Sequence, residues 1–195
     1  MGKEKYIRVI ENLFGKSAVV SSSSIARIVK NKKKTKQYTK QLIRNLISKG
    51  KIKRLTKGYY TSYEEVSLSV FCFKPAYLGL QDAISFHDLW EQETIPIIIT
   101  TRKIRQGIRK VMGMNVLIRR LNKEYFFGFS YHKEGNFYFP YSDIEKTFID
   151  MVYFREKLSK EALKKIKRRI DKRKLNRYLE HYPPKFRKKV LKFLD

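Results

Sequence analysis

The sequence has too few cysteines, histidine pairs and glycine motifs for several common kinds of site. Its single cysteine, Cys72, excludes an internal disulfide and a zinc site built from several cysteines. His87, His132 and His181 lack the spacing of a metal pair such as H-E-x-x-H, and no glycine-rich phosphate loop occurs. We therefore expect no metal site, no cofactor and no catalytic residues, and hence a protein that is not an enzyme.

Long apolar runs are also lacking. The longest run, at residues 95–99, contains Pro96, whereas a membrane span needs about 20 apolar residues. Glu4 and Glu11 interrupt the first apolar stretch, where a signal peptide would carry an uncharged segment. We therefore expect no membrane association and a cytoplasmic location.

Acidic residues are scarce towards the two ends of the chain. The 195 residues include 45 Lys and Arg against 18 Asp and Glu, for a net charge of +27. Residues 1–60 hold 17 basic residues against two acidic ones, residues 61–154 hold 11 of each, and residues 155–195 hold 17 against five. General solubility does not require this segregation, so it indicates a polyanionic partner. A solvated lysine-rich surface is the alternative for the last segment.

Apolar residues recur at helical spacing in three segments of the first sixty residues, at 6–14, 25–29 and 35–49. The serines at 21–24 precede the second segment, where a serine side chain can cap a helix. After Gly50, two short strands are expected around a Thr-Lys-Gly turn. Three helices and a hairpin are the parts of a winged helix-turn-helix DNA-binding domain, which we expect at residues 1–62.

The third helix has the two faces that a recognition helix needs. Leu42, Ile43, Leu46 and Ile47 form an apolar stripe that can face a core. The opposite polar face would enter the major groove of DNA, where glutamine can pair with adenine and arginine with guanine. Lysines at the helix start and on the hairpin would contact phosphates. The expected DNA-binding residues are Lys33, Lys34, Lys36, Gln37, Lys40, Gln41, Arg44, Lys53, Arg54 and Lys57.

The composition changes at residues 62–65, which predicts a second domain over residues 63–195. "IPIIITT", "NVLIRRL", "EYFFGFSYH" and "NFYFP" are β-branched or aromatic and are predicted strands. "AYLGLQDAISFHDLW" and "SDIEKTFIDMVYF" are predicted helices, and a long amphipathic helix over 159–182 opens a basic tail, residues 155–195. The expected fold class is α+β: a winged helix-turn-helix domain, then a mixed α+β domain with a helical basic C-terminal tail.

A nuclease is the enzymatic alternative for a basic α+β protein, because nucleases hold a metal ion with clustered carboxylates. Restriction-type nucleases carry an acidic residue two positions before a strand lysine. No Asp or Glu in this sequence has a lysine at that offset, and the predicted strands are nearly free of acidic residues. A nuclease would therefore need an atypical site.

Three segments carry short motifs of a known family. "KRLTKGYY" is a basic strand followed by Gly and Tyr, and "AYLGLQDAISFHDLWEQETIP" contains an Ala-x-x-x-His-x-Leu helix and a following proline. The residues of the second motif are Ala83, His87, Leu89 and Pro96. "DIEKTFID" is similar to a Glu-Arg-Thr-Leu-x-Asp signature, with Lys146 in place of the arginine. These motifs span most of the chain to about residue 154, and they resemble the AbiEi-type antitoxins, the transcriptional-regulator half of type IV toxin–antitoxin systems.

The resemblance implies a sequence-specific repressor of its own operon that also acts as the antitoxin. Its partners would be double-stranded operator DNA, with inverted repeats bound by a homodimer in the nucleoid, and a nucleotidyltransferase-like toxin encoded next door. The residues themselves indicate only the DNA-binding half of this function. A plasmid- or virus-encoded winged-helix transcription factor without a toxin is the nearest alternative, and a basic RNA-binding protein or an atypical nuclease are the others.

Overall fold

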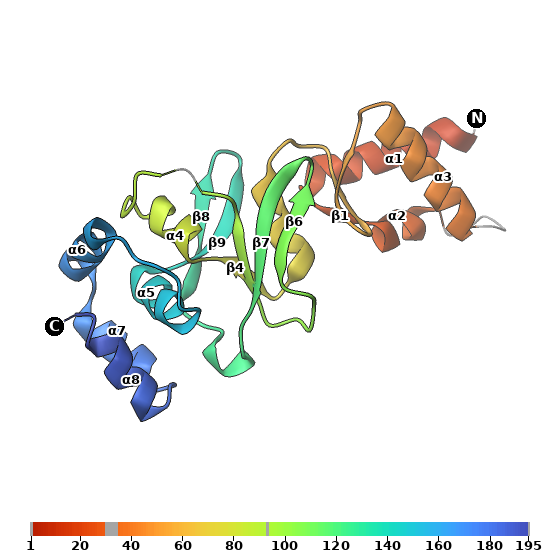
Figure 1. The fold of residues 1–195 in the computed structure, drawn as a ribbon. Helices are drawn as coiled ribbons and strands as arrows, with labels where there is room; N and C mark the ends of the chain where they lie inside the picture. The colour runs from red at the N-terminus through yellow and green to blue at the C-terminus, as the bar shows by residue number, and fades with distance from the viewer. Residues whose placement is uncertain (1, 30–34, 93, 195) are drawn as a thin grey trace. The chain divides into compact units, whose positions relative to one another are not determined.

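The computed structural model describes residues 2–29, 35–92 and 94–194, with the elements arranged along the chain as in Figure 1. Its helices and strands make it an α+β protein, as the sequence predicted. The chain divides into two compact units. The first runs to Cys72 and includes Lys110–Met114, and the second comprises Phe73–Arg109 and the chain from Asn115 onward.

The first unit combines three helices with a small sheet. The three strands form an antiparallel sheet in the order β1-β3-β2. The elements are α1 (Gly2–Lys16), β1 (Val20–Ser21), α2 (Ser22–Ile28), α3 (Thr35–Ser48), β2 (Lys53–Thr56) and β3 (Tyr59–Thr61).

Capping residues stand at the start of α2 and after the end of α3. The Ser21 side chain accepts a hydrogen bond from the Ser24 backbone N–H at 3.0 Å and so caps α2. After α3, Gly50 has a φ of +68°, the left-handed conformation that glycine adopts most easily. The apolar stripes meet in one core, whose buried residues are Ile10, Phe14, Val20, Ile25, Val29, Leu42, Ile43, Leu46 and Ile52.

Most of a mixed six-stranded sheet, in the order β6-β7-β5-β4-β9-β8, belongs to the second unit; the residues that join β6 to β7, Lys110–Met114, are grouped with the first. The strand pairs β4/β5 and β8/β9 are antiparallel, and β4/β9 and β5/β7 are parallel. The strands are β4 (Ala76–Leu78), β5 (Ile97–Thr100), β6 (Gly107–Val111), β7 (Met114–Arg120), β8 (Phe129–Glu134) and β9 (Phe137–Ser142). The helices are α4 (Gln81–Phe86), α5 (Ile144–Tyr153), α6 (Lys160–Arg169), α7 (Lys172–Leu179) and α8 (Pro184–Leu191), with a 3₁₀ turn at Lys123–Tyr125. Another 3₁₀ segment, Val66–Phe73, lies almost entirely in the first unit.

Helix α5 lies between the sheet and the C-terminal helices (Figure 1). It contributes Phe148 and Ile149 to a core that also contains Ile99 of β5 and Ile166 of α6. Residues 155–195, predicted as a basic tail, therefore supply part of the core of this unit rather than an appendage.

A polar network is buried in the same core. Lys146 and Asp150 of α5 form an ion pair with both side chains fully buried, and Tyr77 donates a hydrogen bond to Asp150 Oδ2 at 2.6 Å. Lys146 and Asp150 both belong to the "DIEKTFID" motif. Burial lowers the pKa of the Lys146 ammonium and raises that of the Asp150 carboxyl. Tyr77 satisfies the second carboxyl oxygen, as a buried ion pair requires.

Three segments differ from the sequence-based predictions. "AYLGL", predicted as the start of a helix, forms the buried strand β4, and only Gln81–Phe86 is helical. "EYFFGFSYH" begins with a 3₁₀ turn, and its strand starts at Phe129. The helix predicted over 159–182 is broken, because Ile170 is extended (ψ 131°) and Asp171 caps a new helix, α7.

Candidate nucleic-acid interface

A groove of about 670 Å³ opens in the first unit among α2, α3 and the β2–β3 hairpin. The Ser22 N–H donates to the Gly58 carbonyl at 2.8 Å, which holds the start of α2 against the hairpin turn. Gly58 has a φ of +84°, so the tight turn that makes this contact needs the freedom of glycine.

Five cationic side chains line this groove, and all of them are exposed to solvent. They are Lys36, Lys40 and Arg44 of α3, and Arg54 and Lys57 of the hairpin. No carboxylate lines the groove within the described residues. The groove therefore gathers positive charge on one concave surface, which favours an anionic ligand.

The two glutamines predicted to read bases lie on the exposed side of α3 but do not line the groove. Gln41 Nε2 donates to Asn45 Oδ1 at 3.0 Å, which orients the Gln41 amide along the helix surface. Gln37 is exposed one turn earlier. Together with Arg44 they form a polar face opposite the buried Leu42 and Leu46.

The other three predicted lysines differ in their surroundings. Lys53 is ion-paired with Glu64, and this pair holds the pKa of the exposed Glu64 carboxyl below its usual value. The charge of Lys53 is therefore partly compensated. Lys33 and Lys34 lie outside the described residues.

Several groove residues were not predicted from the sequence. The serine run was interpreted as a helix cap, and Ser21 is the cap, whereas Ser22 and Ser23 line the groove. Tyr60 of β3 also lines it. Ile47 was predicted to be buried, but it is 39% exposed and contributes to the groove wall. The stripe of four apolar residues on α3 is wider than the part of the helix that the core covers. The tertiary fold, and not the local sequence, determines which edge of the stripe stays exposed.

The histidines lack the spacing of a metal pair in the sequence, but His87 and His132 lie close together in the second unit. The rings of His87 and His132 are 6.5 Å apart, and His87 Nε2 lies 2.7 Å from the Ser142 carbonyl oxygen. Within the described residues, no three His, Cys, Asp or Glu side chains form a group that could hold a metal ion. In the same part of the chain, no helix has the length and apolar character needed to cross a membrane.

Comparison with known proteins finds a structural neighbour. The fold resembles the crystal structure of the RV2827C protein from Mycobacterium tuberculosis, with a TM-score of 0.60 and 12% sequence identity. The match covers 96% of this chain and 75% of that one. At this identity the likeness concerns the fold alone. No protein-family model and no curated protein sequence matches the chain.

Proposed function

We propose that the first unit is a winged helix-turn-helix domain that binds duplex DNA in a sequence-specific manner, and that the protein is a transcriptional repressor. The groove between α3 and the hairpin, with its five exposed cations, carries this proposal. In this design α3 enters the major groove, and the β2–β3 hairpin is the wing that contacts the phosphate backbone.

The order of elements in the first unit supports the proposal. A helix, a short strand, two helices and a hairpin follow one another, and the hairpin pairs with the short strand. The exposed side of α3 carries amide and guanidinium groups, which are the groups that read base edges. The hairpin adds Arg54 and Lys57, which suit phosphates.

A binding assay with the full chain tests the proposal. Fluorescence anisotropy compares a duplex from upstream of its own gene with a shuffled duplex of equal composition. The double variant Lys40→Ala, Arg44→Ala removes two groove cations and should weaken binding to the upstream duplex by at least about tenfold. The matched control, Lys16→Ala, Lys49→Ala, removes two exposed cations that do not line the groove, one at the end of α1 and one directly after α3.

The control variant should bind within about twofold of the parent chain. Equal losses in both variants would mean that DNA binds by general positive charge, and the proposal would fail. A structured RNA of equal length, measured at the same salt, should bind more weakly than the upstream duplex. Tighter binding of the RNA would favour an RNA-binding protein instead.

We further propose, from the resemblance to the AbiEi-type family, that the second unit makes the protein an antitoxin. The motifs "AYLGLQDAISFHDLWEQETIP" and "DIEKTFID" support this step, and both lie in that unit. Co-expression with a nucleotidyltransferase-like gene from the same operon should restore growth that the toxin gene alone arrests. Arrested growth despite normal accumulation of the full chain would leave a transcription factor without a toxin.

A further inference from the structure

A second groove lies in the second unit, at the end of α5 and beside α6 and α8. It consists of two adjoining hollows of about 480 Å³ and 460 Å³, which share Val152, Arg155 and Lys189. Its floor is apolar and is made by Val152, Tyr153, Leu158, Leu163, Phe186 and Phe193. Phe193 is 42% exposed, so this apolar surface is accessible to a partner.

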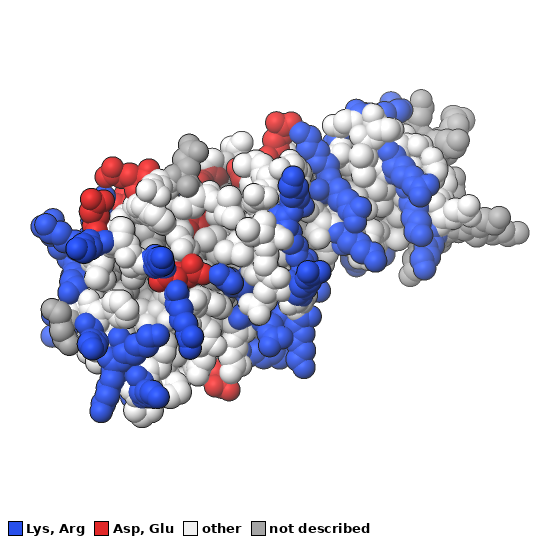
Figure 2. Space-filling view, in the orientation of Figure 1, with Lys and Arg blue, Asp and Glu red and all other residues white. Residues whose placement is uncertain are grey.

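The rim of this groove is cationic. Arg155, Lys157, Lys185 and Lys189 are all exposed there, and none of them has a carboxylate within ion-pair distance among the described residues. Blue Lys and Arg side chains gather over α6–α8 in Figure 2, with pale atoms between them.

The one carboxylate in the lining is already used by the protein. Glu156 accepts hydrogen bonds from Arg119 Nη2 at 2.6 Å and from Gln81 Nε2 at 3.2 Å. It therefore does not neutralise the rim, and the groove offers an apolar floor between uncompensated cations.

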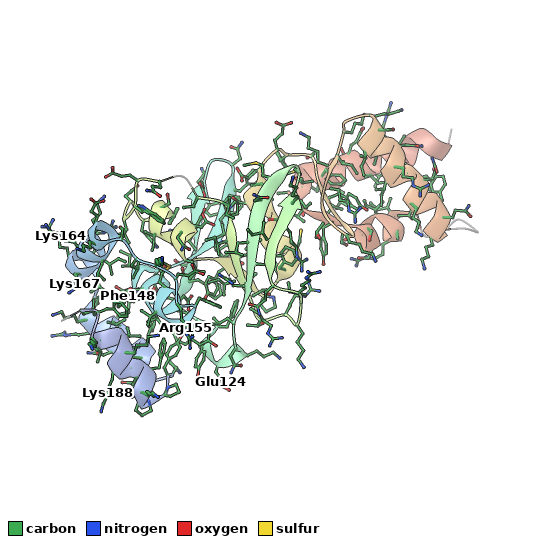
Figure 3. All side chains as sticks on the ribbon, in the orientation of Figure 1. Glu124, Phe148, Arg155, Lys164, Lys167 and Lys188 are labelled. Atoms are coloured by element: carbon green, nitrogen blue, oxygen red, sulfur yellow. The ribbon has the colours of Figure 1, made fainter. Side chains whose placement is uncertain are left out.

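Arg155 stands at a backbone position that favours glycine. Its φ is +57°, and the Glu156 N–H donates to the Met151 carbonyl at 2.9 Å in the manner of a helix C-terminal motif. An arginine there is less favourable for the fold than a glycine would be. The Arg155 side chain lies where α5 ends, at the junction of the two hollows (Figure 3). An unfavourable backbone position occupied by a groove-lining cation points to a use for the side chain.

We propose that this groove binds an acidic, amphipathic polypeptide segment of a partner protein. Apolar side chains of the segment would occupy the floor, and its carboxylates would pair with the rim. The inference goes beyond DNA binding by the first unit and does not rest on it.

The floor favours a polypeptide over a nucleic acid. Bases bind by stacking on open aromatic faces. Here Phe186 is already stacked on Tyr182, with ring centroids 5.0 Å apart, and Tyr153 meets neighbouring rings edge-on. Leu158 and Leu163 offer no ring at all, which leaves Phe193 as the exposed ring of this floor.

The experiment uses the full chain and fluorescein-labelled model helices of about 18 residues. One peptide carries leucine at positions i, i+3, i+4 and i+7 and glutamate elsewhere. One control peptide replaces glutamate with lysine, a second replaces leucine with serine, and a labelled single-stranded DNA is the third control. The Leu/Glu peptide should bind at least about tenfold more tightly than either control peptide.

Neighbouring residues of α8 provide a matched pair of variants. Lys188 and Lys189 are both exposed, but only Lys189 lines the groove (Lys188 is labelled in Figure 3). Lys189→Ala should weaken binding of the Leu/Glu peptide by about fivefold, and Lys188→Ala should leave it within about twofold. Equal effects would mean that the peptide binds anywhere on the basic surface, which would overturn the proposal.

Arg155→Gly separates binding from folding. It should weaken peptide binding by about tenfold while the thermal unfolding temperature stays the same or rises, because glycine suits the left-handed position. Unchanged peptide binding in this variant would contradict the proposal. The proposal would also fail if Arg155→Gly and Lys189→Ala weakened the binding of single-stranded DNA as much as the binding of the peptide. The groove would then be a nucleic-acid site.

Discussion

At the scale of single residues, Gly128 has a backbone conformation and a position that exclude a side chain. Its φ is +71°, and an added Cβ would lie 2.8 Å from Lys146 Cβ and 2.9 Å from Tyr178 Cε2. Gly128→Ala should therefore lower the free energy of unfolding by roughly 1–3 kcal/mol, through both backbone strain and steric overlap. Urea denaturation followed by circular dichroism measures this change.

Gly135 provides the control for the backbone contribution. It also has a positive φ, +57°, but an added Cβ would meet nothing within 4 Å. Gly135→Ala should cost only the backbone part of this loss, about 1 kcal/mol. If both variants were equally destabilised, the close approach of Lys146 and Tyr178 to Gly128 would contribute nothing.

The lowered pKa of His87 predicts that the stability of the fold depends on pH. Burial lowers its pKa below the usual value, and the nearby His132 and Arg169 act in the same direction, against Asp143 and the hydrogen bond to the Ser142 carbonyl. As the pH falls through about 6.5, the unfolded chain takes up a proton at this histidine before the folded chain does. The contribution of His87 to stability is therefore present at neutral pH and is lost on acidification.

The free energy of unfolding, measured by urea denaturation between about pH 7 and pH 5, should decrease for the parent chain. His87→Gln removes the titrating group, so the decrease should be smaller in that variant. Identical pH profiles would show that His87 does not couple protonation to folding.

At the scale of elements, the break between α6 and α7 depends on one cap. The Asp171 carboxylate accepts hydrogen bonds from the backbone N–H groups of Arg173 at 2.8 Å and Lys174 at 3.1 Å, and these bonds lower its pKa. Asp171→Ala should destabilise the protein by about 0.5–2 kcal/mol in urea denaturation, because it leaves these donors without their acceptor. Asp171→Ser retains a cap and should recover most of the loss. Equal stability of the alanine and serine variants would rule out capping as the reason for the break.

The hairpin allows a prediction about phosphate contacts. Lys57 is exposed in the β2–β3 turn and lines the groove. Lys57→Ala should weaken binding to upstream and shuffled duplexes equally, since phosphates carry no sequence. The plot of log K against log salt should also become shallower by about 0.9. A loss confined to the upstream duplex would assign Lys57 to base reading instead.

Elements that are buried on one face were predicted better than elements that are buried on both faces or largely exposed. The helices of the first unit show a clear apolar period because each packs on one face. Their C-terminal ends were predicted closely, but α1 and α2 begin earlier than the predicted segments. Strand β4 is buried on both faces, so Ala76–Leu78 shows no alternation and resembles the start of a helix. Strand β6 exposes Ile108 (66%) and carries Arg109 and Lys110, so nothing in its sequence resembles a strand with a buried face.

The candidate site was predictable in part. Charge and helical spacing identified the cations of α3 and the hairpin, because local sequence determines which face of a short helix is polar. The contribution of Ser22 and Tyr60 was not predictable, since it depends on how α2 and β3 approach α3 in the folded unit. The ion pair of Lys53 with Glu64 joins residues 11 positions apart and was missed for the same reason.

At the scale of the whole molecule, the two basic segments of the chain carry their charge in different surroundings. In the first unit it lines a groove beside α3. In the C-terminal helices it surrounds an apolar hollow, while Ile166, Leu175 and Leu179 of the same helices are buried in the core. Removing residues 155–195 would therefore expose that core, and the role of their charge is better tested by single substitutions such as Lys189→Ala.

The most direct test of the central claim, that α3 reads a DNA sequence, is selection of bound duplexes from a random pool by the full chain. The parent chain should enrich a defined motif. Gln37→Ala and Gln41→Ala should each relax the preference at particular positions, by about 1–3 kcal/mol per lost base contact, and leave the rest of the motif unchanged. A pool that stays random, or an identical motif from the parent chain and both variants, would contradict the assignment of α3 as the recognition helix.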